Sequence, residues 1–99
     1  DTLKGKTYEA TYTDSYLGNV TETIEFTSAS QGVTKAKTKI GTKIENHELD
    51  FVYTYTKPNI EIRTTKIDDI PSVKLNGSIE GKKMTLYDEN GIVTIYTEK

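Results

Sequence analysis

Alternation of apolar and polar residues along much of this chain constrains its fold more than any other feature. The clearest stretch is residues 47–56, where one face would carry His47, Leu49, Phe51, Tyr53 and Tyr55. Successive side chains of a strand point to opposite faces, so this period of two is typical of a strand with one buried face. No stretch shows the spacing of an amphipathic helix. The sequence therefore predicts an all-β protein.

Turn signals divide the alternating stretches into about eight antiparallel strands. We expect the strands at residues 5–13, 20–28, 33–40, 47–56, 60–65, 73–80, 82–87 and 92–97. Short connections between consecutive strands favour an up-and-down meander that closes into a small barrel, or one that stays partly open. A β-sandwich remains the alternative, with longer returns in the expected loops at 41–46 and 66–72.

Three positions bear on whether such a barrel closes. The inward face of residues 33–40 would consist of small residues and Ile40. Gly77, inside the sixth strand, suggests a bend or a bulge. Both faces of the last strand carry apolar side chains, so its inward pair is either Val93 and Ile95 or Ile92 and Tyr96.

Length and charge limit the class of protein. The 99 residues fit one domain, residues 1–99, with a modest core to which seven tyrosines and two phenylalanines contribute. The net charge is −2, and Lys35, Lys37 and Lys39 fit the solvent face of one strand, so we expect no nucleic-acid partner. No apolar run is long enough for a transmembrane segment. We expect a monomer.

The residues that enzymes use do not form a recognisable constellation in this chain. His47 is the only histidine, there is no cysteine, and no serine lies in a Gly-x-Ser-x-Gly elbow. The acidic pairs Asp68–Asp69 and Asp88–Glu89 fall in predicted turns, where solvated carboxylates are the ordinary case. We therefore expect no enzymatic activity, no metal site and no cofactor.

Two segments carry a family resemblance. Residues 77–91, Gly-Ser-Ile-Glu-Gly-Lys-Lys-Met-Thr-Leu-Tyr-Asp-Glu-Asn-Gly, resemble the closing hairpins of small bacterial lipocalin-like domains, and Leu3–Tyr8 is similar to their first strand. Those domains usually have a tryptophan in the first strand that plugs the barrel floor. This chain has none, so Tyr8 would take that role. The resemblance implies an eight-stranded barrel and a secreted or cell-envelope location.

The first residue is Asp1 rather than Met, so we expect either a processed form or a trimmed one. The missing segment is then where we expect any export signal or lipid anchor to lie.

Inward aromatic side chains suggest a function. We expect ligand contacts from Tyr8, Tyr12, Glu22, Phe26, Phe51, Tyr53 and Tyr55. Tyrosine rings give apolar walls and their hydroxyls give polar contacts. An inward carboxylate at Glu22 would either lie near the barrel mouth and reach water or meet a ligand's polar group. The first hypothesis is a small apolar or amphipathic ligand. The alternatives are a filled core in a structural or protein-interaction module, for instance with an envelope protein, and an inhibitor of a hydrolase.

Overall fold

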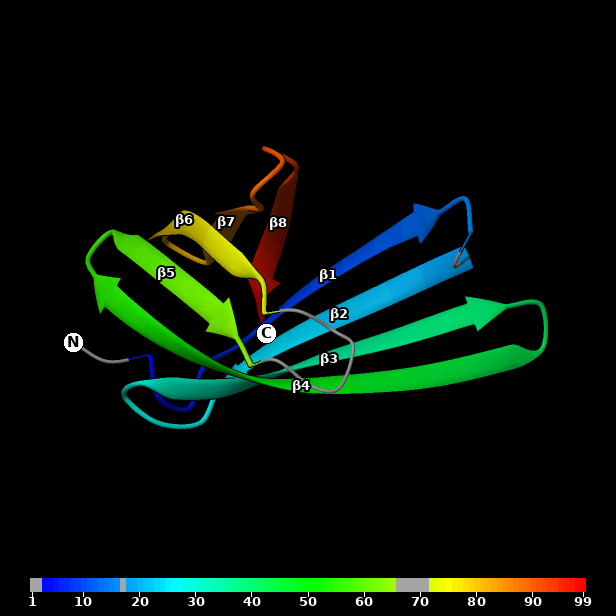
Figure 1. Cartoon of the computed structure of the whole chain (residues 1–99), viewed down its shortest axis with the longest axis horizontal. Helices are drawn as coiled ribbons and strands as arrows, with labels where there is room; N and C mark the ends of the chain where they lie inside the picture. Colours follow the sequence, from blue (N-terminus) through cyan, green and yellow to red (C-terminus); the bar gives the residue numbers. More distant parts are fainter. Residues whose placement is uncertain (1–2, 17, 66–71) are drawn as a thin grey trace.

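The computed structural model describes residues 3–16, 18–65 and 72–99 and contains a closed barrel of eight antiparallel strands (Figure 1). Each strand pairs with the next in the chain, and β8 returns to β1. The predicted all-β meander is thereby confirmed, and the sandwich alternative is excluded. The strands are β1 (Thr7–Asp14), β2 (Gly18–Phe26), β3 (Gln31–Ile40), β4 (Lys43–Thr56), β5 (Asn59–Thr64), β6 (Lys74–Glu80), β7 (Lys83–Tyr87) and β8 (Val93–Glu98).

The first half of the barrel is longer than the second. Strands β1–β4 continue past the ends of β5–β8 as a projecting four-stranded sheet (Figure 1). The sequence prediction of a loop at 41–46 is wrong, because only Gly41 and Thr42 form the turn and β4 begins at Lys43. Gly41 has a φ of 61°, a left-handed conformation that suits so tight a hairpin. The predicted loop at 66–72 lies almost entirely outside the described residues.

The projection changes the surroundings of His47 and Ile40. His47 has the same facing as Phe51, as predicted, yet its side chain is 62% exposed, because it lies on the projecting part of β4, where β5 does not pair with this strand. Ile40 is 51% exposed for the same reason, although it was expected to face inward into a core. Lys35, Lys37 and Lys39 are exposed on β3, as the alternation predicted.

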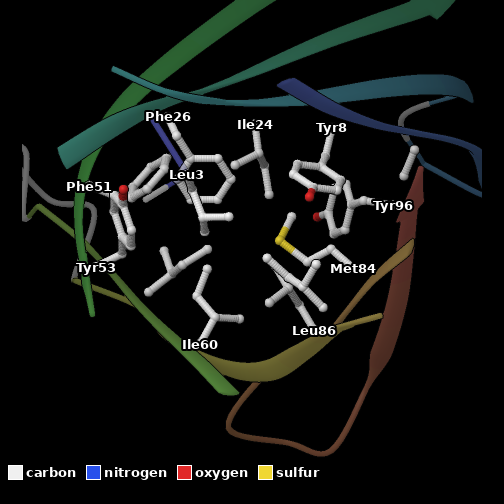
Figure 2. Packing of buried hydrophobic residues seen from close by; sticks show 13 residues of the cluster. Leu3, Tyr8, Ile24, Phe26, Phe51, Tyr53, Ile60, Met84, Leu86 and Tyr96 are labelled. Atoms are coloured by element: carbon white, nitrogen blue, oxygen red, sulfur yellow. The ribbon is translucent and has the colours of Figure 1, made fainter. Parts of the chain in front are cut away.

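Side chains fill the interior of the barrel. Phe26 packs edge-to-face against Phe51, Tyr53 and Tyr8, with ring centroids 5.6, 4.8 and 6.0 Å away. Figure 2 shows Phe26, Phe51 and Tyr53 on one side of the core, and Tyr8 with Met84 and Tyr96 on the other. The aliphatic side chains that complete the cluster include Leu3, Ile24, Ile60, Ile62, Ile79 and Leu86.

Two glycines allow close packing in this interior. A Cβ on Gly32 would lie 2.2 Å from the ring of Phe51, so the ring occupies the space that a side chain would take. A Cβ on Gly77 would lie 1.7 Å from the carbonyl oxygen of Thr85 on β7. Gly77 pairs on both sides in an uninterrupted register, so it permits a close backbone approach and not the bulge that was one expectation.

The facing of β8 settles the predicted ambiguity. Tyr96 is buried and pairs with Met84, whereas Val93 and Ile95 are 48% and 56% exposed. The even-numbered residues therefore face inward. Ile92, the other member of the inward pair, precedes β8 and is 63% exposed.

Candidate binding cleft

The contact that closes the barrel, between β1 and β8, is short. Only two residue pairs join these strands among the described residues, Tyr8 with Glu98 and Glu9 with Thr97. By comparison, β1 and β2 pair along all of β1, from Thr7 to Asp14. Beyond Glu9, β1 continues without a paired strand on its other side in the described part of the chain. The barrel wall therefore opens along more than half of β1, from Ala10 to Asp14.

A cleft of about 890 Å³ occupies this opening. Inward side chains such as Tyr12 and Tyr96 line it, and so do outward ones such as Thr11 and Ile95. The cleft therefore passes through the wall between the edges of β1 and β8. Its volume falls within the range of ordinary small-molecule sites. The described lining residues are Ala10, Thr11, Tyr12, Asp14, Glu22, Val73, Leu75, Leu86, Asp88, Ile92, Val93, Thr94, Ile95 and Tyr96.

Glu22 is the polar centre of the cleft. The Tyr96 hydroxyl donates a hydrogen bond of 2.6 Å to Glu22 Oε2, and the Tyr12 hydroxyl donates one to Oε1. The three side chains come from β8, β2 and β1, so the carboxylate joins the two strands whose backbones have separated. Hydrogen bonds to a charged acceptor are stronger than those between neutral groups.

The environment of the two tyrosines disfavours their ionised forms. Burial raises the pKa of Tyr96, and the nearby carboxylate of Glu22 and its hydrogen bond raise it further. Burial, then the hydrogen bond to Glu22, raises the pKa of Tyr12 in the same direction. Both hydroxyls therefore remain proton donors at neutral pH, with the carboxylate as their acceptor.

The walls of the cleft are apolar and its charged groups are all acidic. Leu75 and Leu86 line it from β6 and β7, and Val93 and Ile95 from β8. Among the described lining residues, every charged side chain is a carboxylate and none is lysine or arginine. Asp88 also accepts hydrogen bonds of 2.8 and 2.9 Å from the amides of Asn90 and Ile92, which fix the loop between β7 and β8. The turn predicted around Asp88–Glu89 is therefore the loop of an antiparallel hairpin, and Asp88 fixes its shape.

Two of the predicted ligand contacts, Tyr12 and Glu22, line the cleft. Tyr12 is 38% exposed there. Phe26, Phe51 and Tyr53 do not line it, because they pack against one another in the filled core.

Tyr8 and Tyr55 are the other two predicted contacts, and neither lines the cleft. Tyr8 is wholly buried in the core, whereas Tyr55 is partly buried against it. The Tyr53 hydroxyl donates a 2.7 Å hydrogen bond to the carbonyl of Ser28, a contact within the barrel.

Sequence reasoning missed Tyr96 and the exposed face of β8. Tyr96 belonged to one of the two possible inward pairs of the last strand. Its separation of 74 positions from Glu22 in the sequence hides their contact. A polar residue at an inward position, such as Glu22, was the available signal, because a buried carboxylate requires partners. The tyrosines at inward positions, Tyr12 among them, were its candidate partners.

Groups typical of catalytic or metal sites stay apart. His47 lies 3.6 Å from Glu45 on the projecting part of β4. None of the described residues that line the cleft belongs to this strand. Lys43 lies 3.0 Å from the same carboxylate and lowers the pKa of Glu45. Within residues 3–16, 18–65 and 72–99, no three side chains of His, Asp or Glu are grouped so that they could hold a metal ion.

Comparison with known proteins gives no relative. No protein-family model, no curated protein and no solved structure matches the chain. In the described part of the chain, no helix has the length and apolar character needed to cross a membrane.

Proposed function

We propose that this protein is a non-enzymatic binding module that takes a small apolar or amphipathic ligand in the cleft between β1 and β8. The observation that carries the proposal is a cleft of about 890 Å³ with apolar walls and a carboxylate, Glu22, that accepts hydrogen bonds from two tyrosine hydroxyls. The ligand's apolar part would lie against Leu75, Leu86 and Val93. Its polar group would lie at Glu22.

The filled interior supports this placement. Lipocalin-like barrels would be expected to hold a ligand inside, yet here Phe26, Phe51 and Ile62 are at most 2% exposed and occupy that space. A barrel of eight strands is just wide enough for its own side chains or for one small ligand. The opening in the wall supplies the room that the interior lacks. A secreted or cell-envelope location, from the lipocalin-like resemblance, belongs to the same proposal.

Decylamine, below its micelle concentration, is a suitable first probe because its chain is apolar and its ammonium group matches an acidic cleft. We expect titration to move the backbone amide NMR signals of Tyr12, Glu22 and Tyr96 and to leave those of Phe51 and Tyr53 unmoved. Glu22→Gln should weaken binding about tenfold, because a carboxylate contact worth ~1.4 kcal/mol is lost.

Glu48→Gln is the matched control, since Glu48 is an exposed carboxylate on β4 outside the cleft. It should leave decylamine binding unchanged. Signal changes centred on the core, or no change up to the micelle concentration, would contradict the proposal.

A protein-interaction module is the second candidate. Val93 and Ile95 face outward on β8 at the rim of the cleft and are 48% and 56% exposed, which makes an apolar patch on the outer wall. This patch adjoins the part of β1 that β8 does not pair with.

A further inference from the structure

Residues 10–13 of β1 form a strand edge that β8 does not cover. A strand presents its N–H and C=O groups alternately to its two neighbours. The Lys6 carbonyl accepts a hydrogen bond from Phe26, on the β2 side, whereas the Thr7 carbonyl accepts one from Lys99, on the β8 side. Thr11 and Thr13 have the facing of Thr7, so their backbone groups point toward the opening. No strand pairs with them there among the described residues.

The facing edge of β8 is open in the same way. The Lys99 amide points to β1 and the Glu98 amide to β7, where it donates to the Lys82 carbonyl. By alternation, the backbone groups of Val93 and Ile95 point toward β1. In the described part of the chain neither edge has a paired strand at this level, and the cleft lies between them. Exposed edges of this kind are templates for an added strand.

The side chains around the opening indicate what strand would fit. On the inner side, Glu22 and Asp88 are acidic, and Leu75 and Leu86 are apolar. A lysine suits this side, because its aliphatic stem packs on the leucines while its ammonium group reaches a carboxylate. On the outer side, the exposed apolar surface of β8 flanks the opening, which favours a β-branched residue there.

We propose that the cleft receives an extended peptide segment of a partner protein, which adds antiparallel to β1 at Thr11 and Thr13 with alternate basic side chains turned inward and apolar ones outward. The peptide is favoured over a second copy of this chain by charge, because β1 itself carries Glu9 and Asp14 and would bring acidic groups to an acidic cleft. The inference rests on the proposed function only in using the same cleft.

The probe is the acetylated and amidated peptide Val-Lys-Val-Lys-Val, titrated into the ¹⁵N-labelled protein. In an antiparallel pair, directly opposed residues have side chains on the same face, so the outward valines pair with Thr11 and Thr13. Their N–H groups point to β1, and those of the lysines point away. We expect shifts of the Thr11 and Thr13 amide signals and slower hydrogen exchange at both.

Backbone methylation of the peptide gives a matched control. N-methylation of the valines removes the donors that face β1 and should weaken binding by at least about tenfold, whereas N-methylation of the lysines should change it by less than about threefold. A Val-Glu-Val-Glu-Val peptide should bind at least about tenfold more weakly than the lysine peptide.

Four outcomes of these peptide experiments would overturn the inference. Absence of binding at millimolar peptide, equal loss with either methylation pattern, equal binding of the glutamate peptide, or shifts that spare Thr11 and Thr13 would each do so. Decylamine that moves Tyr12 and Tyr96 while the peptide does not bind would leave the proposed function in place and refute this inference. Peptide binding without decylamine binding would support this inference and contradict the proposed function.

Discussion

Aromatic side chains serve two different purposes at the two sides of this barrel. Around Phe26 the rings pack against one another and fill the interior, and the Tyr53 hydroxyl donates to a backbone carbonyl. Around Glu22 the hydroxyls of Tyr12 and Tyr96 converge on a carboxylate beside an open cleft. The strands beside Phe26 pair fully, whereas those beside Tyr12 separate. The pairing of the neighbouring strands thus decides whether an inward tyrosine packs in the core or lines the cleft.

The largest expected effect tests the packed side. Phe51→Ala should reduce the free energy of unfolding by about 3–5 kcal/mol, because it removes a buried ring and leaves a cavity among Phe26 and Tyr53. Urea denaturation followed by circular dichroism measures this. Tyr16→Ala is the control, because Tyr16 is 88% exposed and its loss should change stability by less than about 0.5 kcal/mol. Similar losses for both would mean that the core is not packed as described.

A smaller effect tests how tightly the core is filled. Gly32→Ala should cost about 1–3 kcal/mol, because the new methyl group meets the ring of Phe51 and the carbonyl of Glu25. Thermal unfolding measures the loss. Adding a methyl group at an exposed turn, as in Ser30→Thr, should be nearly neutral. An unchanged midpoint for the alanine variant would show that the aromatic side has room to adjust.

The third prediction compares two buried tyrosines. Tyr96→Phe should cost about 1–2 kcal/mol, because Glu22 loses a hydrogen-bond donor. The Tyr8 hydroxyl is buried with no hydrogen-bond partner of normal geometry among the described residues. Tyr8→Phe should therefore leave stability unchanged or raise it by up to ~1 kcal/mol. Urea midpoints of the two variants measure the difference, and a reversed order would refute the assigned roles.

The smallest effect appears only at high pH. The pKa of Tyr96 is raised above its ordinary value of 10.0 by burial and by Glu22, so the unfolded chain loses this proton first. The contribution of this pKa difference to the free energy of unfolding is fully present below about pH 10 and declines as the pH rises above it. Urea midpoints followed from about pH 8 to about pH 11.5 should fall less steeply for Tyr96→Phe than for the natural chain. Equal slopes of urea midpoint against pH for the two proteins would show that Tyr96 has the same pKa in the folded and unfolded states.

The strands followed from local patterns. Alternation from Leu49 to Tyr55 predicted the inward face of β4, and Phe51 and Tyr53 proved buried as that pattern required. Side-chain direction along a strand depends only on the neighbouring residues, so the sequence carries it. Strand ends were less accurate, as at residues 41–46, because polar alternation on an exposed sheet looks like a loop.

The cleft, in contrast, was decided by tertiary structure. Alternation placed Tyr12 and Glu22 on inward faces, where both were expected to contact a ligand. Its contact with Tyr96, and the point where β1 and β8 separate, depend on how a closed sheet accommodates strands of unequal length. That is a property of all eight strands together. No local pattern around Tyr12 or Tyr96 encodes it, so only the assembled barrel shows which tyrosines pack and which line an opening.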